Sequence, residues 1–125
     1  MKRDIENKDD IRELIDAFYN KVLKDDIIGP IFNDVVKIDW EHHLPVMYDF
    51  WENILFQTGG YSGNPMATHM RLHQRHPLTR AHFDQWLKLF TQTVHERFEG
   101  RNAETAGQRA VSIASLMQTR LPGQS

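Results

Sequence analysis

The sequence contains no cysteine. Without thiols the chain can form no disulfide, no thiolate nucleophile and no cysteine-based zinc or iron–sulfur site. A metal ion bound by side chains would therefore need His, Asp, Glu, Met or Tyr ligands. The sequence also lacks an apolar run long enough to span a bilayer, and its N-terminus, "MKRDIENKDD", has no signal-peptide core. We therefore expect a soluble cytoplasmic protein that does not enter a membrane.

An excess of charge of one sign is missing as well. Fifteen Lys and Arg residues face 17 Asp and Glu residues, for a net charge of −2. Nucleic-acid binding needs a concentrated basic face, so we do not expect nucleic acid as a partner. The chain has 125 residues, of which 40% are hydrophobic, which suits one globular core. We expect a single monomeric domain over residues 1–125.

Apolar residues recur with a helical period nearly everywhere, and no segment alternates as a β-strand does. The clearest stripe at helical spacing comprises Ile11, Leu14, Ile15, Phe18, Tyr19, Val22 and Leu23. A short helical turn is expected over "IIGPIFND". A second helix should run from residues 39–40 to about Gln57, where two glycines end it. Pro45 is unfavourable there, because proline removes one backbone hydrogen bond and costs about 3 kcal/mol outside the first turn.

Glycine and proline interrupt residues 61–77, which leaves at most a short helix over residues 66–75. A long helix follows, with Thr79 as its N-cap, and Gly100 ends it. Asn102 is expected to cap a last helix. The expected inward faces of these two helices are Phe83, Trp86, Leu87, Phe90, Val94 and Phe98, then Ala106, Ala110, Ile113, Ala114, Met117 and Leu121. These patterns predict an all-α fold with about four substantial helices.

Three residues on expected inward faces carry polar atoms, namely Tyr19, His43 and Trp86. His43 shares one face of the second helix with Met47 and Phe50. A buried imidazole needs a partner, and such a histidine is more often bonded to a backbone carbonyl in the core than used as a ligand. A tyrosine on an apolar stripe more often reaches the surface with its tip. The three polar groups are therefore either separate compromises or parts of one pocket.

The stretch "NPMATHMRLHQRHP" contains three histidines within eight residues: His69, His73 and His76. Their spacing is plausible for zinc or nickel. However, the segment also holds Arg71 and Arg75 and no carboxylate, which opposes a divalent cation and suits anionic groups. Only His69 has apolar neighbours three residues away on both sides, Met66 and Leu72. If one of the three faces an apolar cavity, it is His69; a solvated surface is favoured for the others.

The residue types match the requirements of haem. A small helical domain is expected to hold a histidine in apolar surroundings, an inward Tyr, an inward Trp and many other aromatic residues. Haem needs an axial imidazole on one face, aromatic and aliphatic walls, and a few hydrogen-bond donors on the other face. The residue types therefore favour a haem pocket.

Four segments carry a family resemblance, in the order "FYNKVLKDDIIGPIFN", "WEHHLPVMYDFW", "YSGNPMATHMRLH" and "PLTRAHFDQWLKLF". Each is weak alone, but their order and spacing together are specific. With them, almost the whole chain resembles a truncated haemoglobin, and more specifically the third group of that family. The resemblance implies a globin-like two-over-two helical sandwich with a very short proximal helix.

The resemblance also implies roles for matching residues. His69 matches the proximal haem-iron ligand. Tyr19 and Trp86 match the residues that donate hydrogen bonds to a diatomic ligand, and His43 matches a gating histidine. Pro45, two residues later, departs from the family pattern and could tilt His43 away from the iron. Contacts with the haem or its propionates are expected from Phe32, Met47, Phe50, Trp51, Met66, Arg71, Leu72, His73, Arg75 and Trp86.

The function implied is a haem b protein that reversibly binds O2, NO or CO, with oxygen binding or transport as its role. One alternative is an enzyme, an NO dioxygenase or a peroxidase-like protein, which needs electrons from a separate reductase. Another is a haem-free helical module that binds zinc or nickel through His69, His73 and His76. The first alternative predicts turnover with a reductant, and the second predicts no coloured cofactor.

Overall fold

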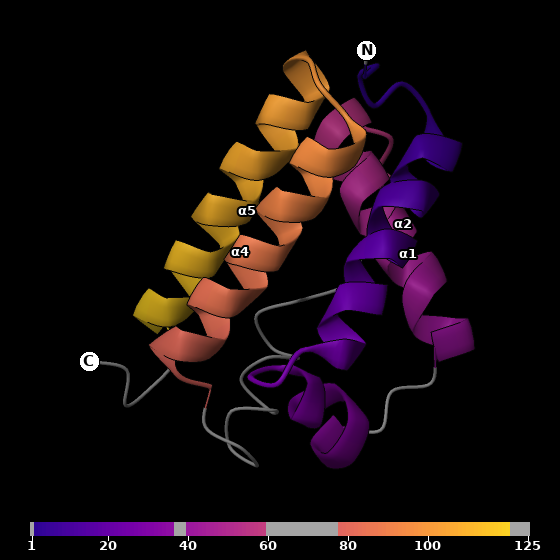
Figure 1. The fold of residues 1–125 in the computed structure, drawn as a ribbon. Helices are drawn as coiled ribbons and strands as arrows, with labels where there is room; N and C mark the ends of the chain where they lie inside the picture. Colours follow the sequence, from indigo (N-terminus) through magenta and orange to yellow (C-terminus); the bar gives the residue numbers. More distant parts are fainter. Residues whose placement is uncertain (1, 37–39, 60–77, 121–125) are drawn as a thin grey trace.

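The computed structural model describes residues 2–36, 40–59 and 78–120. Its helices, in chain order, are α1 (Lys8–Lys24), η1 (Ile31–Val36), α2 (Trp40–Phe56), α4 (Arg80–Arg97) and α5 (Arg101–Arg120) (Figure 1). No strand occurs within the described ranges, which confirms the all-α prediction. None of the helices described is both long and apolar enough to cross a membrane.

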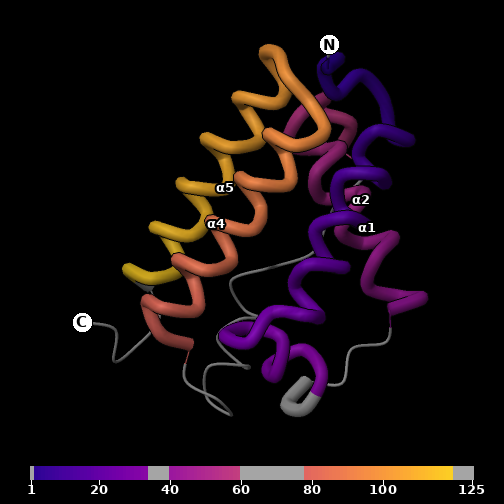
Figure 2. Tube along the Cα trace, in the orientation of Figure 1, coloured from indigo at the N-terminus to yellow at the C-terminus, as the bar shows by residue number. Residues whose placement is uncertain are grey.

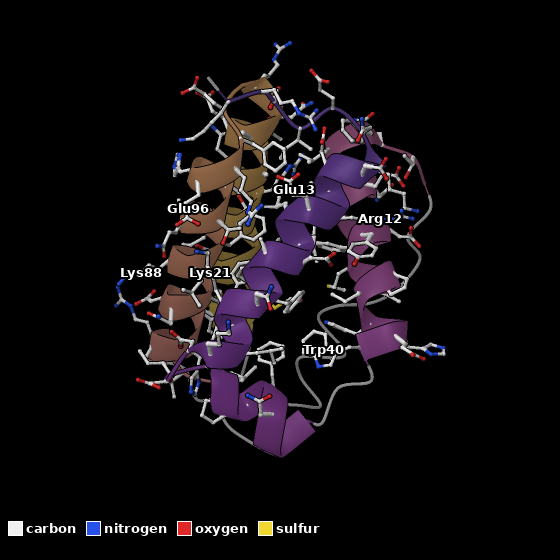
Figure 3. The ribbon with its side chains drawn as sticks, turned by 45° about the vertical axis from the view of Figure 1, so that its right-hand side comes forward. Arg12, Glu13, Lys21, Trp40, Lys88 and Glu96 are labelled. Atoms are coloured by element: carbon white, nitrogen blue, oxygen red, sulfur yellow. The ribbon has the colours of Figure 1, made fainter. Side chains whose placement is uncertain are left out.

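The four long helices form two layers. In Figure 1, α4 and α5 lie side by side on one side of the molecule, and α1 and α2 lie on the other. Contacts between the layers join α1 to α4 and α2 to α5. Lys21 of α1 and Glu96 of α4 form an ion pair of 2.8 Å across them (Figure 3). The arrangement is the globin-like two-over-two sandwich predicted from the sequence.

Helix α1 follows the predicted apolar stripe closely. The side chain of Asn7 accepts a hydrogen bond from the backbone N–H of Asp10 at 3.0 Å, which satisfies one donor of the first turn. Acidic residues occupy the first turn and lysines the last, as the helix dipole favours. The buried apolar face places Phe18 and Tyr19 side by side in the core.

Helix α2 begins at Trp40 and continues through Pro45 to Phe56, so the predicted bounds are confirmed. Pro45 is the sixth helical residue and is exposed. Because proline has no N–H, it removes one backbone hydrogen bond of the helix, and that bond lies close to the helix start. The first turn of α2, which carries His43, keeps its helical form in spite of the proline.

Helix α4 starts after Thr79, as predicted. The backbone N–H of Thr79 donates to Nδ1 of His82 at 3.0 Å. Leu78, before the cap, and Phe83, in the first turn, are both buried and belong to one apolar cluster with Ile31 and Met117. This packing fixes the direction in which the chain enters α4.

The cap of α5 differs from the prediction, which assigned it to Asn102. The helix begins at Arg101, and the carboxylate of Asp4 accepts hydrogen bonds from the backbone N–H groups of Asn102 and Ala103, both at 2.9 Å. The side chain of Asn102 instead donates to the carbonyl of Ile5 at 2.7 Å. Figure 2 shows the N-terminal segment passing beside the connection between α4 and α5. The cap of α5 is therefore supplied by Asp4, 98 positions before Asn102 in the sequence, and not by the side chain of Asn102.

Aromatic rings fill the centre of the sandwich. Phe90 of α4 is fully buried and stacks on Trp51 of α2 at 4.7 Å and on Trp86 at 5.7 Å between ring centroids. Phe18 of α1 meets Phe90 edge-on at 5.3 Å. These four residues, called the Phe90 stack below, join three of the four long helices through ring packing alone.

Candidate haem and ligand site

Two of the predicted site residues meet where α1 faces the first turn of α2. Nε2 of His43 lies 3.3 Å from the hydroxyl oxygen of Tyr19, although the two residues are 24 positions apart. Tyr19 is only 9% exposed, whereas His43 is partly buried. The helical stripes therefore bring together a phenol and an imidazole inside the protein.

Aromatic side chains surround this pair. Phe32, from η1, lies 6.0 Å from Tyr19 between ring centroids. Trp40, the first residue of α2, lies 5.1 Å from Tyr19 and 5.5 Å from His43. In Figure 3 the labelled Trp40 lies between the start of α2 and helix α1. We call these four residues, Tyr19, Phe32, Trp40 and His43, the Tyr19 cluster.

Trp86 is linked to this cluster through Phe18. Its ring meets Phe18 edge-on at 5.9 Å and stacks on Phe90, while Phe18 also contacts Tyr19 at 5.1 Å. Trp86 is partly buried. The three inward polar residues therefore do not form one hydrogen-bonded group, but Phe18 connects Trp86 to the Tyr19 cluster.

The remaining predicted wall residues of α2 differ in depth. Trp51 is 4% exposed and belongs to the Phe90 stack, so it lies in the core. Met47 and Phe50 are partly buried and pack against the same core. They retain accessible apolar surface on the helix that also carries His43.

Burial keeps the Tyr19 hydroxyl protonated beyond its ordinary pH range. The low-dielectric surroundings raise the pKa of its hydroxyl well above the ordinary value, because the phenolate would lose its hydration. The phenol is therefore neutral at physiological pH and retains one O–H donor. The bond to His43 can have either direction, depending on which ring nitrogen of His43 carries the proton.

Several predicted residues lie outside the described residues: Met66, His69, Arg71, Leu72, His73, Arg75 and His76. The proximal ligand and the proposed three-histidine metal site are among them. Within the part of the chain that is described, no three His, Asp or Glu side chains lie together as a metal site would require.

Sequence reasoning missed Trp40, which it used only to mark a helix start. The signal was present, because Trp40 precedes His43 by three residues and therefore shares its helical face. A large aromatic residue one turn before an inward histidine could have been recognised as its neighbour.

Two layers of helices with a partly buried phenol–imidazole pair between α1 and α2 define a small protein of the globin class. Residues 4–119 match the family described as bacterial-like globin, and the chain belongs to that family. It is 34% identical over 124 residues to the group 3 truncated hemoglobin ctb of Campylobacter jejuni, covering 97% of this chain and 95% of that protein.

A solved structure gives the same result. The crystal structure of the group III truncated hemoglobin from Campylobacter jejuni aligns with a TM-score of 0.85 and 33% identity, covering 98% of this chain and 97% of that one. The predicted membership in the third group of truncated haemoglobins is confirmed. Globins bind haem and diatomic gases, so this chain is a haem-binding globin.

Proposed function

We propose that the protein binds haem b through His69 and binds O2, NO or CO beside the Tyr19 cluster, with Tyr19 and Trp86 as hydrogen-bond donors. The observation that carries the proposal is the contact between Tyr19 and His43, a polar pair held inside an aromatic cluster. Burying a hydroxyl or an imidazole costs free energy unless it is hydrogen-bonded, and here the two groups contact each other inside the protein.

The described residues suit the cofactor. Phe32, Met47 and Phe50 are apolar yet only partly buried, so they offer surface that a flat apolar macrocycle can cover. Phe32 comes from η1, and Met47 and Phe50 come from α2, the helix that also carries Trp40 and His43. Apolar walls adjacent to a few polar donors are the lining that haem proteins use.

When bound, haem supplies an iron atom that takes up a diatomic ligand and gives bound O2 partial negative charge. The role of the chain is to offer donors to that charge in a dry environment. The neutral phenol of Tyr19 would donate a hydrogen bond to such a ligand, and the indole N–H of Trp86, whose ring packs against Phe18, would be the second donor. Both donors favour retention of O2.

His43 controls whether the Tyr19 proton is available. If Nε2 of His43 is protonated, it donates to the Tyr19 oxygen, and the phenol proton can point to the ligand. If Nε2 is unprotonated, it accepts the phenol proton, which is then withheld from the ligand. The tautomer of His43 therefore adjusts the hydrogen bond that the ligand receives.

The proximal side rests on the sequence. His69 is the proposed iron ligand because apolar residues flank it and because the sequence motif around it resembles the family's proximal segment. Arg71, His73 and Arg75 are proposed to meet the propionates, for which guanidinium and imidazole groups are suitable partners. We propose the same cytoplasmic, monomeric state that the sequence predicted.

An absorption spectrum of the purified protein, before and after addition of hemin, tests the proposal. We expect a haem spectrum and, after pyridine treatment, the bands of haem b. His69→Ala should lose the axial-histidine signal, whereas the matched His73→Ala should retain it. A colourless protein that takes up no haem contradicts the proposal, and bound zinc or nickel would support the metal-binding alternative instead.

Reversible binding and enzymatic turnover can then be separated. NO dioxygenation or peroxide reduction requires an electron donor, so repeated consumption of NO or peroxide with a reductase or chemical reductant would identify an enzyme. Simple binding gives one equivalent of ligand uptake and release per haem.

A further inference from the structure

Trp40 occupies a central place in the Tyr19 cluster that the proposed function does not use. Its ring contacts all three other members: Tyr19 at 5.1 Å, His43 at 5.5 Å and Phe32 at 6.2 Å. Trp40 belongs to the same helical turn as His43 and reaches across to α1. It is therefore placed to act on the phenol and the imidazole together.

We propose that Trp40 is a positioning residue that fixes the relative orientation of the His43 and Tyr19 side chains. It thereby sets the strength of the hydrogen bond that Tyr19 offers to a ligand. The inference rests on the proposed function, since it concerns the same ligand site. It adds a specificity-determining residue that does not itself touch the ligand.

Trp40 restricts the orientation of the His43 ring. The terminal torsion of histidine is broad, so the rings packed against the imidazole influence which plane it adopts. The Trp40 ring meets it at 78°, an edge-on geometry that favours one ring orientation. Because the two residues are three positions apart on α2, the helix itself maintains this contact.

Trp40 also constrains the Tyr19 side. Its ring lies at 62° to the phenol and stacks with Phe32 at 21°. It is partly buried and packs against both members of the polar pair. A bulky ring beside Tyr19 and His43 limits the access of water to them, and a hydrogen bond is stronger where water is excluded. Loss of the ring should loosen the His43 orientation and admit water.

The test compares Trp40→Leu and Trp40→Phe in the haem-loaded protein. Leucine removes the flat ring, whereas phenylalanine retains an aromatic face. We expect Trp40→Leu to raise the C–O stretching frequency after reduction and addition of CO, because the ligand loses a hydrogen-bond donor. O2 dissociation should be faster, roughly threefold to tenfold. Trp40→Phe should remain close to the wild type.

Phe56→Leu is the matched control. Phe56 is a partly buried aromatic residue at the far end of α2 that packs against the same core, so its loss reports general weakening of the helix. The C–O frequency of Phe56→Leu should equal that of the wild type. An equal shift in this control would overturn the role of Trp40. If Trp40→Leu does not fold, Trp40→Met takes its place with the same expectation.

A double substitution separates positioning from simple packing. If Trp40 acts through Tyr19, Tyr19→Phe with Trp40→Leu should release O2 as fast as Tyr19→Phe alone, because the two effects are not additive. Nitrogen-15 NMR of the His43 ring in the haem-loaded protein should show a changed tautomer balance in Trp40→Leu. A folded Trp40→Leu with wild-type C–O frequency, O2 release and His43 signals refutes this inference alone. Unchanged values in Tyr19→Phe would instead refute the proposed function.

Discussion

Two polar contacts join distant parts of this chain, and they are built differently. At the start of α5 the carboxylate of Asp4 accepts three backbone N–H groups, from Ile5, Asn102 and Ala103, each at 2.9 Å. Between α1 and α2, Tyr19 and His43 share one longer contact of 3.3 Å. The first contact uses most of the accepting capacity of its carboxylate, whereas the second leaves hydrogen-bonding capacity on the phenol.

This difference separates a structural contact from a functional one. Normal distances to rigid backbone donors fix the N-terminal segment against α5, and little accepting capacity remains on the carboxylate for a ligand. The Tyr19 phenol is neutral, and the donor or acceptor role of its partner His43 depends on the tautomer of the imidazole. The phenol can therefore replace its hydrogen bond to His43 with one to a ligand at little cost in free energy. Substitutions at the Asp4 contact should therefore change stability, and substitutions at the Tyr19 contact should change ligand release.

The largest effect is expected from Gly100→Ala. Gly100 has a φ of +144°, and a Cβ there would lie 2.5 Å from Cγ of Asp4. The new methyl group would strain the backbone and displace the carboxylate, and the free energy of unfolding should fall by about 2–4 kcal/mol. Urea unfolding measures it. Gly107→Ala is the control: its Cβ would meet nothing within 4 Å, so it should stabilise α5 by about 0.5–1 kcal/mol. Equal losses in both variants would contradict the expectation.

Asp4→Ala should have the next largest effect. It removes the acceptor for the first N–H groups of α5, and the loss of such a cap typically costs about 1–2 kcal/mol. Tyr19→Phe should change stability far less, because only one long hydrogen bond is lost. If thermal unfolding shows that Tyr19→Phe is the more destabilising of the two, the proposed division between the contacts is wrong.

The sequence predicted the helices well because their apolar stripes are local patterns. The bounds of α1, α2 and α4 follow from residues within each helix, and the predicted cap residue Thr79 indeed precedes α4. The cap of α5 could not be predicted in this way, because Asp4 is distant in sequence and Asn102 offered a plausible local substitute. Thr93 was also missed: it is fully buried, and its hydroxyl is satisfied by the carbonyl of Leu89 at 2.7 Å.

The candidate site was predictable in its residue types and less so in its arrangement. Periodicity placed Tyr19, His43 and Trp86 on inward faces, but it could not show which of them would meet. Only tertiary packing puts His43 against Tyr19, while Trp86 contacts Phe18, the neighbour of Tyr19. Pro45 does not interrupt α2, and His43 lies 3.3 Å from Tyr19 in spite of it; whether the proline tilts His43 relative to the iron stays a prediction.

Tyr19→Phe should increase the rate of O2 release, which tests whether the Tyr19 contact is functional. The ligand loses a hydrogen bond of about 1–1.5 kcal/mol, so O2 dissociation should be roughly tenfold faster. Trp86→Phe should also speed release. Stopped-flow displacement of O2 by CO measures both rates. Tyr48→Phe is the control, because Tyr48 donates to Asp16 on the outside of α1 and should not affect the rate. Wild-type release from both Tyr19→Phe and Trp86→Phe would remove their proposed role.

The smallest expected effect is the pH dependence of the Asp4 contact. Partial burial alone would raise the pKa of Asp4, but the backbone donors Asn102, Ala103 and Ile5 outweigh it and hold the pKa below the ordinary value. A lowered pKa in the folded state means that the carboxylate stabilises the fold above the unfolded value, near pH 4, and loses this contribution as the pH falls through the folded value. Asp4→Asn cannot titrate. Its urea midpoint, relative to wild type, should be lower at about pH 6 and should approach wild type at about pH 2.5. A constant difference in urea midpoint between the two proteins across this range would mean that the negative charge of Asp4 does not contribute to stability. The α5 contact would then be no more specific to an ionised group than the Tyr19 contact is.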